Sequence, residues 1–283
     1  MKKLLKQFGI ALITIIAFSS CVNLKHVNDF SSTSSESIKL FEELDYSFEQ
    51  SCTDNCTTKK INELKIDSDE CDCNLEKVAD SITLKIYSSV NGYFEGLSKL
   101  SDNELTTYKT EDLEIALIEG DFGSITIEET QVKSYSQVSQ ILIRAFTDTY
   151  RKSKIKEYVK YANQAVKELI NFLDFNLSSN LVGKLNVKKS RIKSDYFDLL
   201  DDNSLSTIEK RNSLKEYYSI LDDIKNQQKK INSYSKSLTK ISEGHQKLYD
   251  NVDKLSVKEI KQSLFQYASE IKSIISEFKK VEE

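Results

Sequence analysis

The chain of 283 residues contains no proline and no tryptophan, and it has only seven glycines and two histidines. At average usage a chain of this length would carry about fourteen prolines. Because proline ends or kinks a helix, its absence favours long helices. The two histidines, His26 and His245, offer little material for histidine-based acid–base catalysis.

Familiar catalytic motifs are also absent. The sequence contains no H-E-x-x-H, no phosphate-binding P-loop and no G-x-S-x-G. The "DFG" at residues 121–123 matches a metal-binding motif of kinases, but the glycine-rich loop and the H-R-D motif of those enzymes are missing. We therefore expect the protein not to be an enzyme, and we expect no cofactor and no metal ion.

Charge is abundant and mostly balanced. Charged residues make up 30% of the chain, and the net charge is −4. Residues 22–73 hold five lysines against twelve acidic side chains, whereas residues 74–283 hold 32 of each sign. Interspersed charges of both signs are typical of solvated helix faces. No basic patch stands out, so a nucleic acid is not expected as a partner.

The N-terminus begins with Lys2, Lys3 and Lys6 and continues as an apolar run around residues 10–18. This run is about eleven residues long, whereas a membrane-spanning helix needs about twenty. A positive start, a short apolar middle and small residues at the end are typical of a secretory signal.

The end of this stretch, "FSSC", resembles the lipobox of bacterial lipoproteins. The resemblance covers residues 1–21 and implies that a signal peptide of residues 1–20 is cut off after Ser20. It also implies that Cys21 carries a diacylglyceryl group on its thiol and an acyl chain such as palmitate on its new amino group. The alternative is an ordinary secretory signal cut after Ser19. Lipidation would leave an even number of cysteines, all of which could pair.

The remaining cysteines are Cys52, Cys56, Cys71 and Cys73. Positions i and i+4 share one face of a helix, and positions i and i+2 share one face of an extended segment. The two pairs can therefore lie opposite each other, and an antiparallel approach gives Cys52–Cys73 and Cys56–Cys71. A direct Cys71–Cys73 bond is disfavoured because it closes a strained ring. The sequence thus predicts a region closed by two disulfides.

Two metal sites are alternatives for this region. A four-thiolate zinc site is disfavoured because the spacing is uncommon and an oxidising compartment favours disulfides. The "DSDECDC" from Asp67 lacks the fifth and twelfth ligands of a calcium loop, which here are Cys71 and Val78. We expect a solvated acidic loop instead, preceded by a possible short strand at residues 61–66.

The chain divides by composition after the signal peptide. Residues 21–35 are polar and rich in serine, and they predict a flexible tether after the lipid anchor, with His26 in solvent. Residues 36–100 predict a small, acidic, disulfide-stapled helical region. Residues 101–283 predict a helical bundle.

The strongest periodic pattern lies in that bundle. Apolar side chains recur at spacings of three and four from Tyr217 to Leu255, which predicts a helix of roughly 70 Å. A kink or a break in this helix is expected at Gly244. His245 is expected to form a polar layer that fixes the register or to cap a helix; a ligand or a pH switch is the alternative.

The same 3–4 pattern returns at residues 257–281, and a turn is expected at residues 198–206. Sustained spacing of this kind with short links predicts a mainly α fold, namely an elongated antiparallel bundle of long helices.

Together these features predict a non-catalytic lipoprotein of the bacterial cell envelope. The lipid on Cys21 would hold it in a membrane, which in a Gram-negative cell would be the outer membrane, on its periplasmic or surface side. A helical scaffold or adaptor that binds another envelope protein is the first hypothesis. A ligand-binding or inhibitory lipoprotein of the immunity type is the second. A pocket of convergent polar groups would favour the second, and a filled core with exposed apolar residues would favour the first.

Overall fold

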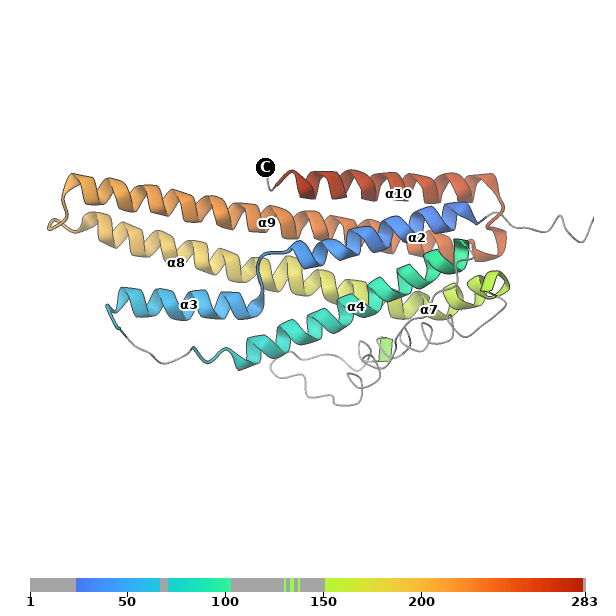
Figure 1. The fold of residues 1–283 in the computed structure, drawn as a ribbon, viewed down its shortest axis with the longest axis horizontal. Coiled ribbons are helices and arrows are strands. Elements are labelled where there is room, and N and C mark those ends of the chain that lie inside the picture. Colours follow the sequence, from blue (N-terminus) through green and yellow to red (C-terminus); the bar gives the residue numbers. More distant parts are fainter. Residues whose placement is uncertain are drawn as a thin grey trace, which may run out of the picture.

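The computed structural model describes residues 24–66, 71–102 and 151–281, together with residues 130, 133, 134 and 137. The described residues are almost entirely helical and include no strand. The helices lie along one long axis, and the helical segments of residues 74–102, 151–201, 207–250 and 258–279 run in alternating directions (Figure 1). The predicted class, a mainly α, elongated antiparallel bundle, is confirmed.

The longest helix is α9, Thr207–Asp250, whose 44 residues span about 66 Å. It begins at a capping box, in which Ser206 Oγ accepts a hydrogen bond from Glu209 N and the Glu209 carboxylate accepts one from Ser206 N. The predicted turn lies just before it, at residues 202–206. The helix does not break at Gly244, because α9 continues past this residue to Asp250.

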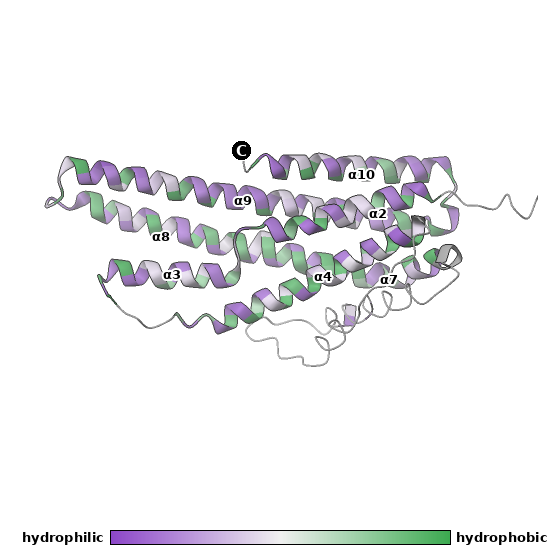
Figure 2. Ribbon diagram, viewed as in Figure 1, coloured by the Kyte–Doolittle hydropathy of each residue, from purple (hydrophilic) through white to green (hydrophobic). Residues whose placement is uncertain are grey.

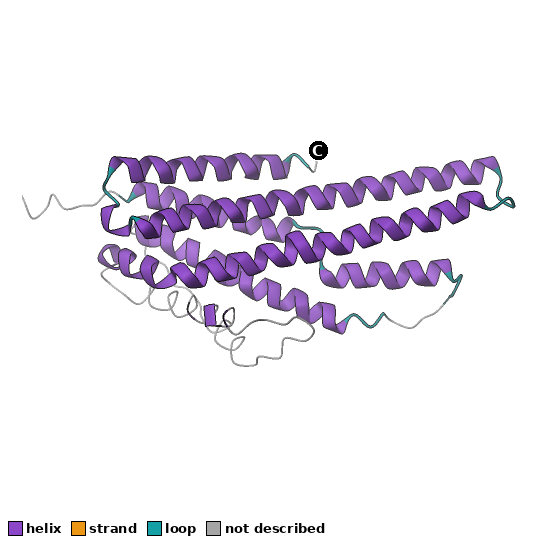
Figure 3. Cartoon of the chain, turned by 180° about the vertical axis from the view of Figure 1, so that it is seen from behind, coloured by secondary structure: helices purple, strands orange, loops and turns teal. Residues whose placement is uncertain are grey.

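One continuous helical rod runs antiparallel to α9. It consists of α7, Arg151–Asp174, the π-helical segment η2, Phe175–Leu181, and α8, Val182–Asp201. The turn at residues 202–206 joins this rod to α9 at one end of the molecule (Figure 1). Seen from behind, short loops join the helix that ends at residue 201 to α9 and α9 to the last helix (Figure 3).

Helix α10, Lys258–Lys279, follows α9 after the short 3-10 turn η3, Val252–Lys254, and packs on α9 and α2. Hydrophobic and hydrophilic residues alternate along each long helix (Figure 2). The apolar faces form one core that extends from Leu24 to Phe278. The predicted seam is confirmed, because Leu238 and Ile241 are fully buried.

Residues 25–38 are the main departure from the sequence prediction. They form helix α2, Lys25–Ile38, rather than a tether, and most of the helix is buried. Burial of Ser31 and Ser34 is tolerated because their hydroxyls donate back to the helix backbone, Ser31 Oγ to Val27 O at 2.7 Å and Ser34 Oγ to Phe30 O at 2.8 Å. Their small size also lets α2 lie close to α4, where Ser35 Oγ donates to Asn91 Oδ1 at 2.8 Å.

The chain then passes through the 3-10 turn η1, Lys39–Glu43, into α3, Phe48–Asn62, and α4, Asn74–Asp102. The Asp80 carboxylate of α4 accepts hydrogen bonds from the first two backbone N–H groups of α3, both at 2.9 Å. The strand predicted at residues 61–66 does not form, because α3 continues to Asn62 and a turn follows. Helices α2 and α4 share the core of α7, α9 and α10, so the stapled region and the bundle are one packed unit.

Candidate functional site

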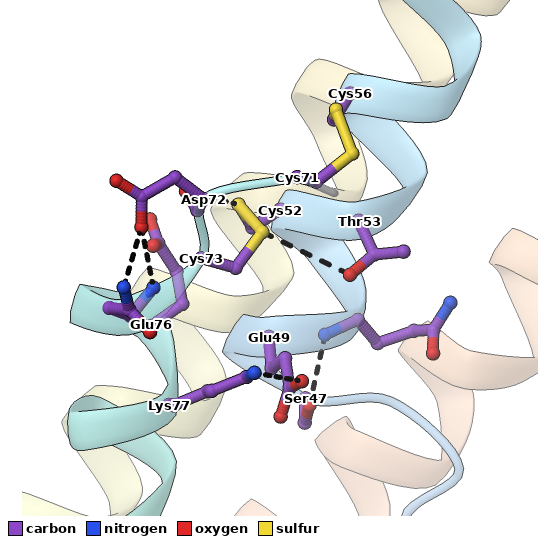
Figure 4. The surroundings of a disulfide bond; sticks show 12 residues. Ser47, Glu49, Cys52, Thr53, Cys56, Cys71, Asp72, Cys73, Glu76 and Lys77 are labelled. Carbon is purple, nitrogen blue, oxygen red and sulfur yellow. Dashed lines mark hydrogen bonds and ion pairs between the residues drawn. A yellow bond between two sulfur atoms is a disulfide. The ribbon is translucent and has the colours of Figure 1, made fainter. Parts of the chain in front are cut away.

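The two predicted disulfides are present with the antiparallel pairing (Figure 4). Cys52 is bonded to Cys73 with their Cα atoms 5.8 Å apart, and Cys56 is bonded to Cys71 with their Cα atoms 6.1 Å apart. Two cysteines one turn apart on α3 thus meet two cysteines of the non-helical residues that lead into α4. The pair of bonds holds α3 beside the start of α4.

All four cysteines of the zinc hypothesis are bonded in these disulfides, so none of them is left as a thiolate ligand for zinc. In the part of the chain that the structure describes, no three His, Cys, Asp or Glu side chains are grouped to hold a metal ion. Residues 67–70, which include most of the sequence considered for calcium, lie outside the described residues.

A groove of about 1420 Å³ lies between α3, α8 and α9 and is open to solvent. We call it the distal groove, because it occupies the half of the bundle farther from the start of α2 (Figure 1). Helix α3 packs on α4 and α8 but is separated from α9 by this groove. The three helices therefore form a trough with one open side.

The floor and the outer rim of the distal groove are apolar. Ile192, Tyr196 and Ile220 lie on the floor and are buried or partly buried. Ile61 and Leu64 on the rim are 65% and 91% exposed.

Backbone geometry is also unusual at this rim. Leu64 has a φ of 52°, a left-handed conformation that glycine usually supplies at a helix C-terminus. Lys65 N donates back to Lys60 O at 3.0 Å, which closes the turn after α3. A leucine there accepts backbone strain of about 1 kcal/mol and presents its side chain to solvent.

The walls of the groove are mainly acidic. Two lysines line it, and each has a carboxylate partner: Lys188 Nζ lies 2.6 Å from Asp54 Oδ2, and Lys230 Nζ lies 2.7 Å from Asp45 Oδ2. Four further carboxylates line the groove, from Asp195, Asp198, Glu216 and Asp223. With six carboxylates and two ammonium groups, the lining has a formal charge of −4.

Buried acceptors without donors accompany these charges. Asp195 Oδ2 and Gln227 Oε1 are shielded from solvent and accept no hydrogen bond from any described residue. Tyr196 donates a hydrogen bond to Glu216. The pKa of the Tyr196 hydroxyl is raised to about 12, mainly by burial and also by this hydrogen bond. The groove therefore combines negative charge with an apolar floor.

A second polar cluster lies deep in the other half of the bundle. Tyr93 and Asn163 bracket His245, with Tyr93 Oη 2.8 Å from His245 Nε2 and Asn163 Oδ1 3.1 Å from His245 Nδ1. Asn163 Nδ2 is directed at Gln246 Oε1, so Asn163 Oδ1 accepts from Nδ1–H and Nε2 accepts from the Tyr93 hydroxyl. Burial lowers the pKa of His245 to about 3. The imidazole is thus neutral and joins α4, α7 and α9, as the predicted polar layer requires.

The other residues singled out from the sequence are placed as follows. Cys21 lies outside the described residues. His26 is not in solvent as predicted but is 1% exposed, because α2 packs in the core. Its ring lies edge-on to Phe265 with centroids 6.5 Å apart, and burial and Lys261 lower its pKa.

Sequence reasoning missed the distal groove. Its residues belong to three helices whose separate patterns are ordinary, and only their convergence makes the site. One signal was available in the sequence: apolar residues near the ends of α3 and α8, such as Ile61 and Leu199, fall outside the 3–4 stripes. Leu199 is 40% exposed in the structure.

Comparisons with protein-family models, curated proteins and solved structures find no significant match. Among the described residues, no helix combines the length and apolar character needed to cross a membrane.

Proposed function

We propose that this chain is a lipid-anchored, non-catalytic protein of the bacterial cell envelope that binds another protein. The lipobox resemblance at Ser20–Cys21 supports the anchor. The two disulfides support a location outside the cytoplasm, because they persist in oxidising compartments.

The arrangement of the bundle indicates which of its ends would face the membrane. Leu24, the first described residue, follows Cys21 by three positions. The start of α2 lies at the end of the bundle opposite the α8–α9 turn (Figure 1). A lipid on Cys21 would therefore hold the start of α2 close to the membrane. The distal groove and the α8–α9 turn would be directed away from it.

The distal groove is the observation that carries the binding proposal. Its volume of about 1420 Å³ exceeds the range of about 300–1,000 Å³ that is usual for small-molecule pockets. Exposed apolar side chains line its rim, among them Ile61 and Leu64, and such patches are typical of protein-binding sites. A protein segment fits these properties better than a small solute.

A ligand-binding or inhibitory role is the second candidate, because polar side chains such as Asp195, Gln227 and Asn226 also line the groove. In that case a small polar molecule, and not a protein, would occupy the groove.

Site-specific photo-crosslinking in the native envelope separates these possibilities. A photo-reactive residue at Ile61 or Leu199 should give a discrete protein adduct, whereas one at Leu84 of α4, which is 50% exposed and outside the groove, should not. Equal adducts at Ile61 and Leu84, or none at Ile61 and Leu199, would contradict the proposal.

The anchor is tested separately with Cys21→Ser. Labelling with a fatty-acid analogue should mark the wild-type protein but not this variant, and the variant should leave the membrane fraction. A wild-type protein that is soluble and starts at Ser20 would instead support the ordinary signal.

A further inference from the structure

We propose that the distal groove binds a basic amphipathic helix of about four turns from the partner protein. This inference rests on the proposed protein-binding function and specifies the chemistry of its partner. Three independent properties support it: the dimensions of the groove, the absence of a covering helix there among the described residues, and the charge of its lining.

The dimensions match one α-helix. The α3 wall extends from Gln50 to Asn62 and the α9 wall from Glu216 to Lys230, which correspond to about 18 Å and 21 Å of helix axis. A helix with its side chains is about 10–12 Å wide, so a four-turn helix occupies roughly 1,700–2,400 Å³. The groove volume of about 1420 Å³ would hold most of such a helix and leave its outer face in solvent on the open side.

The groove begins where two helices of the bundle stop covering α9. Tyr234 Oη donates to Ile38 O at the end of α2, and Lys230 Nζ lies 5.9 Å from the Phe278 ring of α10. One turn farther along α9, toward Glu216, neither α2 nor α10 covers this face of α9, and the groove lies there instead. Val281 lines the end of the groove nearest to α10. A guest helix would therefore occupy the position that α2 and α10 occupy in the other half of the bundle.

To complement this lining, the bound helix needs an apolar stripe and basic side chains. Ile192, Tyr196 and Ile220 would contact the stripe. Asp195 of α8 and Asp223 of α9 both line the groove, and neither has a lysine or arginine partner among the described residues. Lysine or arginine side chains would pair with these carboxylates.

The test uses the mature, disulfide-bonded chain without its lipid and a fluorescent 14-residue peptide as the probe. The peptide has leucines at positions i, i+3, i+4 and lysines and arginines elsewhere. A matched peptide carries glutamate at every basic position. Fluorescence anisotropy should show saturable binding of the basic peptide, weakened by salt, and at least about tenfold weaker binding of the acidic one.

Neighbouring acids provide a matched pair of variants. Asp223→Lys should weaken binding of the basic peptide by about tenfold, because it reverses a charge in the groove lining. Asp222→Lys makes the same change one residue away, outside the lining, and should alter binding by less than about twofold. Circular dichroism establishes that both variants keep the fold. Equal effects of the two variants, or equal binding of the two peptides, would overturn the proposal.

Two other outcomes are distinguished by the same materials. If Asp223→Lys instead converts a dimer to a monomer in light scattering, a second copy occupies the groove and the proposal is wrong. If no peptide binds but the photo-reactive residue at Ile61 still captures a protein, the protein-binding function stands and only the basic helix is excluded. If both fail, both proposals fall.

Discussion

Gly244 of α9 lies directly against the ring of Phe30 of α2, and a Cβ atom at position 244 would come within 2.7 Å of Phe30 Cζ. The ring has little freedom to move, because Phe30 is fully buried and meets the edge of Phe94 with centroids 6.1 Å apart. This contact joins the N-terminal helix to the centre of the bundle. It also explains why a glycine is present inside a long helix.

Gly244→Ala should therefore destabilise the protein. Overpacking a filled core costs about 1–3 kcal/mol, which outweighs the gain of up to about 1 kcal/mol from replacing a helical glycine. Gly183→Ala is the matched control, because nothing lies within 4 Å of a Cβ atom there, and it should stabilise the protein by about 0.5–1 kcal/mol. Urea unfolding measures both. A stabilised Gly244→Ala variant would show that α2 does not pack as described.

Leu238→Asp should unfold the bundle. Leu238 is fully buried in the seam of α9, and an unpaired carboxylate there should cost more than about 3 kcal/mol. Lys236→Ala, two residues away on the exposed face, should change the unfolding free energy by less than about 0.5 kcal/mol. Thermal unfolding followed by circular dichroism tests the pair. A Leu238→Asp variant with wild-type thermal stability would contradict the buried seam.

Acidification should destabilise the fold through His245. Its pKa falls to about 3 in the folded chain because it is buried, whereas in the unfolded chain it is about 6.5. Below pH 6.5 the unfolded state binds the proton first, so stability present above pH 6.5 is lost as pH falls toward 3. The loss is about 1.4 kcal/mol per pH unit, or about 2 kcal/mol at pH 5.

Urea unfolding at pH 7 and pH 5 checks this effect against His245→Gln, which removes the titrating group. The pH dependence of the variant should be smaller by about 2 kcal/mol. His26 is the only other histidine, and its pKa is also lowered, so His26→Gln should reduce the pH dependence further. A wild-type pH profile in the His245→Gln variant would count against a buried neutral imidazole.

Removing one disulfide should loosen α3 without opening the seam. The double variant Cys56→Ser and Cys71→Ser opens a loop with a sequence separation of 15, and such loops stabilise by about 3 kcal/mol. Hydrogen exchange should rise in α3 and at the start of α4, while α9 around Leu238 stays protected. Peptide binding should weaken, because α3 forms one wall of the distal groove.

Thr53→Ala is the control for that experiment, since Thr53 Oγ1 lies 3.9 Å from Cys73 Sγ but takes no part in the bond. It should leave exchange in α3 nearly unchanged. A uniform rise in exchange along the whole chain of the double variant would mean that the disulfides stabilise the bundle as one cooperative unit.

Much of the fold was predictable because it depends on neighbours in sequence. The 3–4 spacing from Tyr217 to Leu255 identified a long buried seam, and the polar residues before Ser206 identified the turn. The cysteine spacing allowed the observed pairing, because one helical turn and two extended residues have similar lengths. Each of these features is set by local backbone geometry and by side chains within a few positions of one another.

Residues 25–38 and the distal groove could not be predicted in this way. A serine-rich segment is polar by composition, yet Ser31 and Ser34 return their hydroxyls to the helix backbone, and the small side chains then permit close packing on α4. Whether such a helix is buried depends on a partner surface elsewhere in the chain.

The groove has a similar origin, because it exists where α2 and α10 end and α3 lies apart from α9. Formation of the long helices was therefore determined by the sequence alone, through proline content, apolar spacing and the local cap at Ser206. Burial of α2 and the shape and charge of the distal groove were decided only by tertiary structure. The physical reason is that both depend on which surfaces, distant in sequence, meet and exclude water.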